Sequence, residues 1–136
     1  MTTTLIPYLN FPSQSKAAME FYHSVFGGKL TMQTFGESGM KVSEQEKDLV
    51  IHAELKTDLF TIMASDGGVM HAVTMGNNIN MSLIGTDEVQ LRGFFEKLSE
   101  GGKIDMKLEK QFWGDMYGRL TDKFGVHWMV NISAQK

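Results

Sequence analysis

Two seven-residue stretches, FGGKLTM at residues 26–32 and EGGKIDM at residues 100–106, decide the fold of this chain. Each follows a segment with apolar residues at helical spacing, and each passes through Gly-Gly-Lys into a segment typical of a strand. Glycine ends helices because it adopts the left-handed backbone conformation without steric cost. The two stretches therefore mark the same helix-to-strand junction twice, and the sequence predicts an internal repeat.

The first copy is predicted to run strand, helix, strand, strand, strand. The strand LIPYLNF has Pro7 near its start, where the missing amide proton is tolerated, and places Leu5, Leu9 and Phe11 on one face. Ser13 or Ser15 is expected to cap the helix. Its predicted apolar stripe is Ala18, Phe21, Tyr22, Val25 and Phe26, of which Phe21, Tyr22 and Phe26 are predicted to be core. KLTMQTF, DLVIHAEL and LFTIMASD follow as strands, and the polar loop 36–47 is expected to be mobile.

The second copy repeats this order. NINMSLIG is a predicted strand, Asp87 opens a helix that Gly101 and Gly102 close, and KIDMKL begins a new set of strands. We therefore predict an α+β fold of two βαβββ modules, residues 4–66 and 78–133, joined by a linker of residues 67–77. One helix covers only one face of each sheet, so the modules are expected to pack together or to swap between subunits.

Composition excludes several classes of protein. The 136 residues fit one domain, and the net charge of −3 is spread without basic blocks, which argues against a nucleic-acid binder. No apolar run approaches the ~20 residues of a membrane helix, and the N-terminal residues lack the pattern of a signal peptide, so a cytoplasmic protein is expected. Without cysteine, chemistry has to come from histidine, carboxylates, hydroxyls or backbone groups.

The residues and their order resemble a known group of proteins. PYLNF, AAMEFYHSVFGGKL, VIHAELK, IMASD and FWGDMYGRLTDKFGVHWMVN resemble the PhnB-like branch of the vicinal oxygen chelate superfamily, which also holds glyoxalase I, bleomycin resistance proteins and extradiol dioxygenases. The likeness covers residues 5–132, and its most specific motif is WGxxYGxxxDxFGxxW at 113–128. The resemblance implies paired βαβββ modules whose sheets curl around a central cavity, and a homodimer.

Metal-using relatives hold a divalent ion through His, Gln and Glu side chains on the first, fourth, fifth and eighth strands. At the matching positions this chain carries Pro7, Tyr8 or Asn10, then Thr61, Met63 or Ser65, then Asn80 to Ser82, and finally Met129. Met129 stands where metal-binding relatives have glutamate, and a thioether supplies no charge to a hard divalent ion. No metal and no cofactor are therefore expected, and neither is glyoxalase or dioxygenase activity.

Two histidines are candidates for the site. Val50, His52 and Glu54 alternate with Leu49, Ile51, Ala53 and Leu55, so they are expected on a strand face turned away from the helix. A histidine beside a carboxylate can act as a general base, and a hydrogen-bonded structural histidine is the alternative. His127 is expected on the strand face that also carries Met129 and Asn131. His23 and His71 are predicted to be solvent-exposed.

The aromatic residues of the last segment admit two roles. Trp113, Tyr117 and Trp128 either pack in the core and at its rim or hold a ligand by stacking. Gly114, Gly118 and Gly125 are read as turn or bulge positions, and Asp122 with Lys123 as the turn before the last strand. The eleven methionines suggest an adaptable apolar lining.

The favoured function is metal-independent binding of a small hydrophobic or aromatic molecule. The residues expected to bind it are Tyr8, Asn10, His52, Met63, Trp113, Tyr117, His127 and Met129. The alternative is an enzyme of lyase, isomerase or transferase type that uses His52 and Glu54 or an atypical metal site. A label of quinone-precursor methyltransferase is often attached to this branch, but no predicted strand leads into the glycine-rich turn that cradles a nucleoside cofactor.

Overall fold

The computed structural model describes residues 2–67 and 72–134 and divides the chain into two compact units, Met1–Thr74 and Met75–Lys136. The units are described one at a time. None of the helices found in the described residues is both long and apolar enough to cross a membrane.

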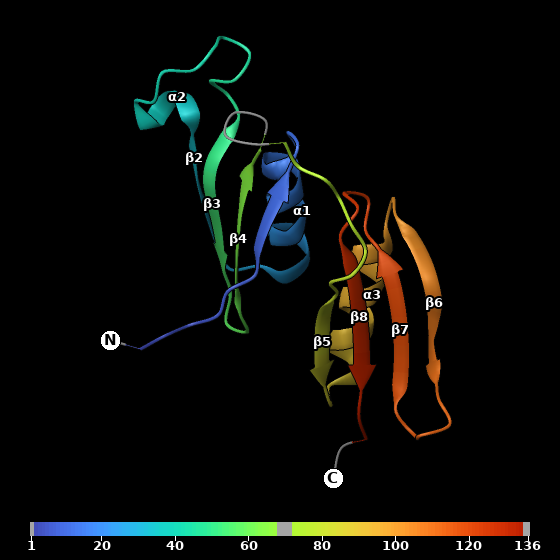
Figure 1. The fold of residues 1–136 in the computed structure, drawn as a ribbon. Coiled ribbons are helices and arrows are strands. Elements are labelled where there is room, and N and C mark those ends of the chain that lie inside the picture. The colour runs from blue at the N-terminus through green and yellow to red at the C-terminus, as the bar shows by residue number, and fades with distance from the viewer. Residues whose placement is uncertain (1, 68–71, 135–136) are drawn as a thin grey trace. The chain divides into compact units, whose positions relative to one another are not determined.

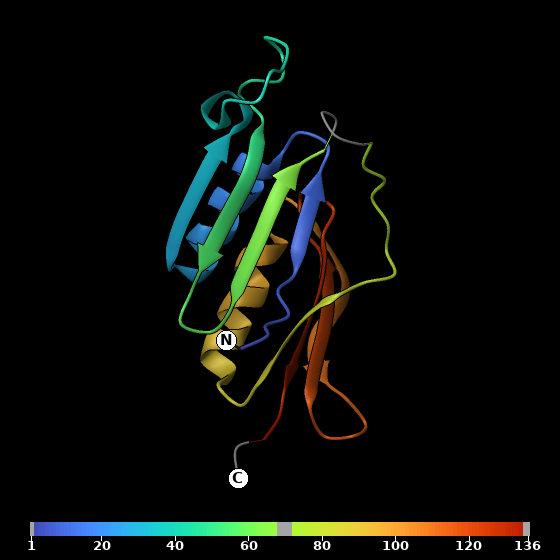
Figure 2. The same cartoon turned by 60° about the vertical axis from the view of Figure 1, so that its left-hand side comes forward.

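The first unit is one mixed sheet with a helix on one face. Its elements are β1 (Tyr8–Phe11), α1 (Ser15–Phe26), β2 (Lys29–Thr34), α2 (Phe35–Ser38), β3 (Val50–Lys56) and β4 (Thr61–Asp66). The strand order is β1-β4-β3-β2, with β1 parallel to β4 and the other pairs antiparallel. Helix α1 packs along β2, β3 and β4 on one side of this sheet (Figures 1 and 2).

The second unit repeats the same topology. Its elements are β5 (Met81–Gly85), α3 (Glu88–Ser99), β6 (Lys103–Lys110), β7 (Met116–Thr121) and β8 (His127–Ile132). The strand order β5-β8-β7-β6 matches that of the first sheet, with β5 parallel to β8 (Figure 1). The α+β fold of two βαβββ modules that the sequence predicts is confirmed.

Three local predictions about the first unit were wrong. Strand β1 begins at Tyr8, after Pro7, and Leu5 lies outside it with 96% of its surface exposed. The segment predicted as a loop from residue 36 begins inside the short helix α2, which Thr34 and Glu37 close with reciprocal hydrogen bonds as a capping box. Of the three aromatic residues predicted as core, only Tyr22 is buried, because it follows Ala18 by one helical turn on the sheet-facing side. Phe21 and Phe26 are partly buried at the edges of that side.

Helix α1 is capped by a residue far away in the sequence. Neither Ser13 nor Ser15 caps it, and its N-cap residue, Gln14, makes no side-chain capping bond. Instead, Oδ1 of Asp66 accepts a hydrogen bond of 2.9 Å from the backbone amide of Ser15, and Oδ2 accepts one of 2.9 Å from the amide of Val50. A buried carboxylate at the end of β4 therefore joins the start of the helix to the start of β3, and its negative charge suits a helix N-terminus.

A second buried carboxylate closes the turn between β7 and β8. Asp122, only 3% exposed, accepts hydrogen bonds from the amides of Phe124 and Val126 at 2.9 and 3.0 Å and from the indole Nε1 of Trp128 at 2.9 Å. The predicted turn role of Asp122 is confirmed. Trp128 is 1% exposed, so of the two roles left open for it the structure supports core packing.

The three glycines of the last segment are required for two different structural reasons. Gly114 and Gly125 have φ of 101° and 88°, so they are turn positions as predicted. Gly118 lies within β7, opposite a register shift in β6 between Met106 and Glu109. A Cβ atom at Gly118 would lie 2.9 Å from the Cα of Leu108 and 2.9 Å from the Cε2 of Phe95, so close packing excludes any side chain there.

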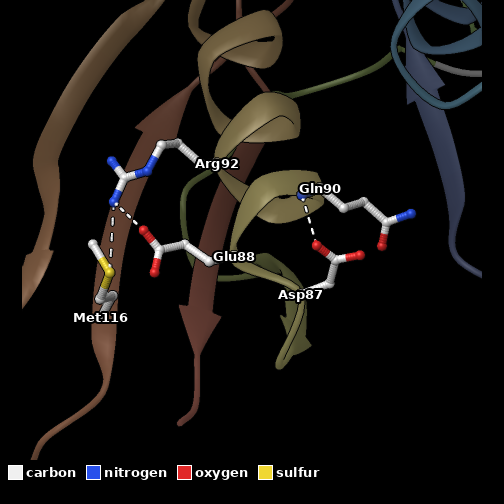
Figure 3. Close-up of polar contacts among 5 residues, drawn as sticks. All are labelled: Asp87, Glu88, Gln90, Arg92 and Met116. Atoms are coloured by element: carbon white, nitrogen blue, oxygen red, sulfur yellow. Dashed lines mark hydrogen bonds and ion pairs between the residues drawn. The ribbon is translucent and has the colours of Figure 1, made fainter. Parts of the chain in front are cut away.

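Helix α3 begins as the sequence predicts. The side chain of Asp87 accepts a hydrogen bond of 3.0 Å from the amide of Gln90 (Figure 3). One turn further, Arg92 pairs with Glu88 at 3.2 Å and also contacts the sulfur of Met116 at 3.5 Å (Figure 3). These contacts tie the first turns of α3 to β7.

Candidate functional site

Each sheet has one face that no helix of its own unit covers, and we call this the helix-free face. In the first unit, Ala53 and Leu55 on β3 are fully buried on the α1 side. His52, the residue directly before Ala53, is exposed. Strand alternation then places His52 and Glu54 on the helix-free face, as the sequence predicts. On β1 and β4, Tyr8 and Asn10 are the register partners of Met63 and Ser65.

The candidate residues of the first sheet contact one another. The hydroxyl of Tyr8 lies 3.2 Å from Nδ1 of His52, and the two rings are 5.8 Å apart between centroids. The hydroxyl of Ser65 donates a hydrogen bond of 3.2 Å to Oδ1 of Asn10. Tyr8 and Asn10 on β1, Ser65 on β4 and His52 on β3 thus form a polar and aromatic surface across three strands, with Tyr8 44% exposed.

The pairing of His52 with Glu54 does not occur. Within the described residues, the hydrogen-bond partner of His52 is Tyr8, and Glu54 lies beside Met63 in the ladder between β3 and β4. Side chains two positions apart on a strand share a face without meeting, because the strand rises about 3.3 Å per residue. The arrangement orients the imidazole through a phenol rather than through a carboxylate.

The second sheet carries its candidates in the same way. Gly85 and Gly118 point towards Leu91 and Phe95 of α3, which fixes the helix side of β5 and β7. The helix-free face of β7 and β8 therefore holds the alternate residues, which are partly buried: Tyr117, Arg119, Thr121, His127, Met129 and Asn131. Trp113 lies in the connection between β6 and β7, 48% exposed, with its ring 5.9 Å from that of Tyr117. Tyr117, His127 and Met129 thus share one surface, with Trp113 at its edge.

His127 belongs to a short hydrogen-bonded chain. The hydroxyl of Thr121 donates to Oδ2 of Asp105 at 2.7 Å and lies 3.0 Å from Nδ1 of His127. A hydroxyl has one proton, so Nδ1 has to be the donor in the second bond. This leaves Nε2 of a neutral His127 as the acceptor. Sequence reasoning missed Asp105 and Thr121, since they come from different strands.

Arg119 is a functional candidate that sequence reasoning also missed. Its Nη2 donates one long hydrogen bond of 3.4 Å to Oδ1 of Asn80, just before β5. Its Nε is buried and has no hydrogen-bond partner within residues 2–67 and 72–134, and no ion pair involves Arg119 in that part of the chain. The available signal was the alternation YGRLT, which puts Arg119 on the same face as Tyr117 and Thr121.

The positions that correspond to metal ligands in relatives do not suit a divalent ion. Tyr8 pairs with Met63 in the first sheet, and Ser82 pairs with Met129 in the second. Neither pair offers a carboxylate or an imidazole, which such ions prefer. Across the described residues, no three side chains of His, Asp or Glu gather in a way that could hold a metal.

Of the two remaining histidines, His23 lies apart from these faces. His23 is exposed on α1, as predicted, and its Nε2 lies 3.1 Å from the carbonyl oxygen of Gly28. His71 falls outside the described residues.

A cavity of about 530 Å³ lies at the start of α3, lined by residues 86–89 and 132–134. Its lining contains none of the residues that the sequence predicts to bind a ligand. The carboxylate of Asp87 already occupies the helix N-terminus, and Glu88 adds a second negative charge (Figure 3). The candidate residues therefore lie on the helix-free face of each unit, taken separately.

Comparison with known proteins identifies relatives that match almost the whole chain. The sequence profile of the family described as 3-demethylubiquinone-9 3-methyltransferase matches residues 3–131. Protein YjdN of Escherichia coli K12 is 27% identical over 97% of both chains. The crystal structure of protein PA1353 from Pseudomonas aeruginosa is 33% identical, with a TM-score of 0.88 over 98% of this chain and 100% of that one. The PhnB protein from Bacillus cereus is 25% identical, with a TM-score of 0.77 over 96% and 100%.

A more distant likeness concerns the fold alone. A glyoxalase/bleomycin resistance protein/dioxygenase family enzyme from Burkholderia phytofirmans superposes with a TM-score of 0.60 at 16% identity, covering 92% of this chain and 95% of that one. The shared architecture is the pair of βαβββ modules.

Proposed function

Because the chain belongs to the 3-demethylubiquinone-9 3-methyltransferase family, the PhnB-like branch of the vicinal oxygen chelate superfamily, we propose that it binds a small hydrophobic or aromatic molecule without a metal ion. The observation that carries this proposal is the composition of the helix-free faces. Aromatic rings, thioethers and single polar groups meet there, a mixture typical of small-molecule sites. The residues concerned are Tyr8, Asn10, His52 and Met63 in the first unit and Trp113, Tyr117, His127 and Met129 in the second.

The donor set supports the metal-free part of the proposal. A divalent ion in a partly buried site needs several charged or strongly basic ligands with supporting contacts. Phenol, thioether and hydroxyl groups at the four strand positions leave such a charge uncompensated. We therefore expect no tightly held metal.

The turns that lead into the two long helices of the described residues lack the cofactor cradle that the family's description as a methyltransferase calls for. The turns into the two twelve-residue helices, α1 and α3, consist of Pro12–Gln14 and Thr86–Asp87. Neither turn contains a glycine, whereas nucleoside cofactors are held by a glycine-rich turn between a strand and a helix. Binding of a small molecule needs no such turn.

We also propose that the chain forms a homodimer. The superfamily resemblance implies it, and the second unit exposes several large apolar side chains that a partner surface would cover, including Ile84 and Phe112, which are 70% and 97% exposed. Light scattering at micromolar concentration is expected to give twice the mass of 15.3 kDa. A mass of one chain contradicts the dimer and leaves the binding proposal standing.

Methyl NMR provides the test of binding. The eleven methionines carry isolated methyl groups, and the signals of Met63 and Met129 can be assigned with Met→Leu variants. Indole and benzamide, two neutral aromatic probes, are expected to shift one or both signals in buffer containing a chelator. Met40, exposed and outside both sheets, serves as the control and should not move.

Two outcomes contradict the proposal. The first is that neither probe moves Met63 or Met129 up to its solubility limit. The second is that movement requires added Ni²⁺, Zn²⁺, Mn²⁺ or Mg²⁺, which would show that a metal completes the site. Calorimetric titration with each ion alone then measures the metal affinity directly.

A further inference from the structure

We propose that Arg119 makes the helix-free face of the second sheet a binding site for the carboxylate group of a small aromatic acid. This inference rests on the proposed function, because it adds a charged group to the small molecule already proposed. Its argument depends on Arg119, Asn80 and the groups beside them on β7 and β8.

The first step concerns the charge of Arg119. A guanidinium stays protonated in proteins, and a partly buried one is normally paired with an anion. Arg119 is partly buried, yet it forms no ion pair within the described residues. The nearby carboxylate of Asp105 is engaged by Thr121, and that of Asp115 by Asn131 and Ser133. Arg119 therefore has no direct ion-pair partner among the described residues of this unit.

The second step concerns hydrogen bonds. A buried donor without an acceptor costs about 1–3 kcal/mol and calls for an explanation. Nε of Arg119 is such a donor, and the single bond from Nη2 is long at 3.4 Å. An acceptor with negative charge supplied by a ligand satisfies Nε and balances the charge at the same time.

The other arginine of the chain provides the contrast. Arg92 pairs with Glu88 at 3.2 Å and contacts the sulfur of Met116 at 3.5 Å (Figure 3). Its charge is compensated on the surface of α3. The chain thus holds one paired and one unpaired guanidinium among the described residues, and only the unpaired one lies on the helix-free face.

The surroundings of Arg119 favour a carboxylate on an aromatic body. Arginine only donates hydrogen bonds, so Oδ1 of Asn80 has to face it, which leaves the Nδ2 protons of Asn80 as further donors. A carboxylate has two oxygens that match two such donors. Met129, the ladder partner of Arg119, and Tyr117, two residues away on the same face, provide apolar and aromatic contacts for a ring.

The experiment uses the Nε–H signals of arginine in a ¹⁵N–¹H spectrum. The sequence contains two arginines, so the spectrum holds two such signals, and an Arg92→Lys variant assigns them. Benzoate is the anionic probe, benzamide its neutral counterpart of the same shape, and sodium chloride at equal ionic strength the salt control. We expect benzoate to shift the Nε–H signal of Arg119 in a saturable way and to leave that of Arg92 in place, and we expect neither benzamide nor chloride to shift it.

Substitutions of the two arginines give an independent measure of how much Arg119 contributes to benzoate binding. Arg119→Gln is expected to weaken benzoate binding by about ten- to a hundred-fold, the value of a hydrogen-bonded charge pair. Arg119→Lys, which keeps the charge but loses the planar fork, should recover part of the affinity. Arg92→Gln should bind benzoate as the unmodified protein does. Because the spectra use the unmodified chain, the inference stays testable even where Arg119→Gln does not fold.

The results distinguish failure of the carboxylate site from failure of the proposed small-molecule binding. Equal shifts of both arginine signals, equal shifts with chloride, or no shift with benzoate overturn the carboxylate site. If benzamide and indole still move the Met129 methyl signal in that case, the proposed function stands and only the charge of the ligand is wrong. If no probe moves any signal of Met63, Met129 or Arg119, both fail together.

Discussion

Removal of the Asp122 carboxylate is expected to unfold the second unit at much lower denaturant. The carboxylate is 3% exposed and accepts three hydrogen bonds of 2.9–3.0 Å. Each bond to a charged acceptor contributes about 1.5–3 kcal/mol, and its loss leaves a buried donor unpaired. Local relaxation and entering water recover part of the sum, so we expect Asp122→Ala to cost about 4–6 kcal/mol. A single domain has only about 5–15 kcal/mol of stability, so this loss is close to the limit.

Urea denaturation followed by tryptophan fluorescence measures this loss. Both tryptophans, Trp113 and Trp128, lie in the second unit, and Trp113→Phe as background isolates the buried one that donates to Asp122. Asp122→Asn keeps one acceptor oxygen and is expected to lose about half as much, which provides a measurement if the alanine variant does not fold. Glu96→Ala removes an exposed carboxylate of the same unit and should change stability by less than about 0.5 kcal/mol. Equal small losses for the Asp122 and Glu96 variants refute the reasoning.

Three further predictions concern the close packing at Gly118, the buried side of helix α1 and the hydrogen-bonded carboxylate of Glu37. Gly118→Ala should destabilise the second unit in the same denaturation assay, because a Cβ atom there meets neighbouring atoms at 2.9 Å; an unchanged midpoint would contradict this. Tyr22→Ala should cost about 3–5 kcal/mol and Phe21→Ala clearly less, since only Tyr22 is fully buried; equal losses would be evidence against the assigned helix face. The pKa of Glu37 is lowered because the backbone amide and then the hydroxyl of Thr34 hydrogen-bond to its carboxylate. Its stabilising contribution is therefore full above the unfolded pKa and lost as pH falls through the folded one, so an NMR acid titration should give Glu37 a midpoint below the ordinary value of a glutamate side chain.

The sequence predicts the modules and their faces because both depend on local rules. Two Gly-Gly-Lys junctions place the ends of the helices, and the positive φ of 74° at Gly27 and 73° at Gly101 is a backbone conformation that glycine adopts without steric cost. The period of two along β3 and β8 then separates the helix side from the helix-free side. His52 and His127 lie where this alternation puts them.

The hydrogen-bond partners of the site residues depend on pairing between segments that are far apart in the sequence. Rules based on local sequence patterns do not predict such pairing. Asp66 caps α1 from 51 positions away, in place of the nearby serines. In the second sheet, β6 has eight residues against six in β7, and the two register shifts this requires set which β6 side chains meet Thr121 and Arg119. The sequence of β6 has no periodicity that indicates these register shifts, so the hydrogen bond between Asp105 and Thr121 could not be predicted.

The chain from Asp105 through Thr121 to His127 leads to a prediction about a proton. Since the hydroxyl of Thr121 donates to Asp105 at 2.7 Å, its oxygen accepts from Nδ1 of His127 at 3.0 Å, and neutral His127 should carry its proton on Nδ1. Neutral imidazole in water favours a proton on Nε2, so the protein has to reverse the usual preference. Long-range ¹H–¹⁵N spectra distinguish the two tautomers through the nitrogen shifts of the ring.

Thr121→Val should return His127 to the ordinary tautomer, because the methyl group accepts no hydrogen bond. Thr121→Ser keeps the hydroxyl and should preserve the proton on Nδ1, which makes it the matched control. His23 serves as the reference for the opposite tautomer, since its Nε2 lies 3.1 Å from the carbonyl oxygen of Gly28, which can only accept a hydrogen bond. If His127 carries its proton on Nε2 in the unmodified protein, the assigned direction of the bond to Thr121 is wrong. If the prediction holds, Nε2 is left as the atom of His127 that can accept a hydrogen bond from a ligand on this face.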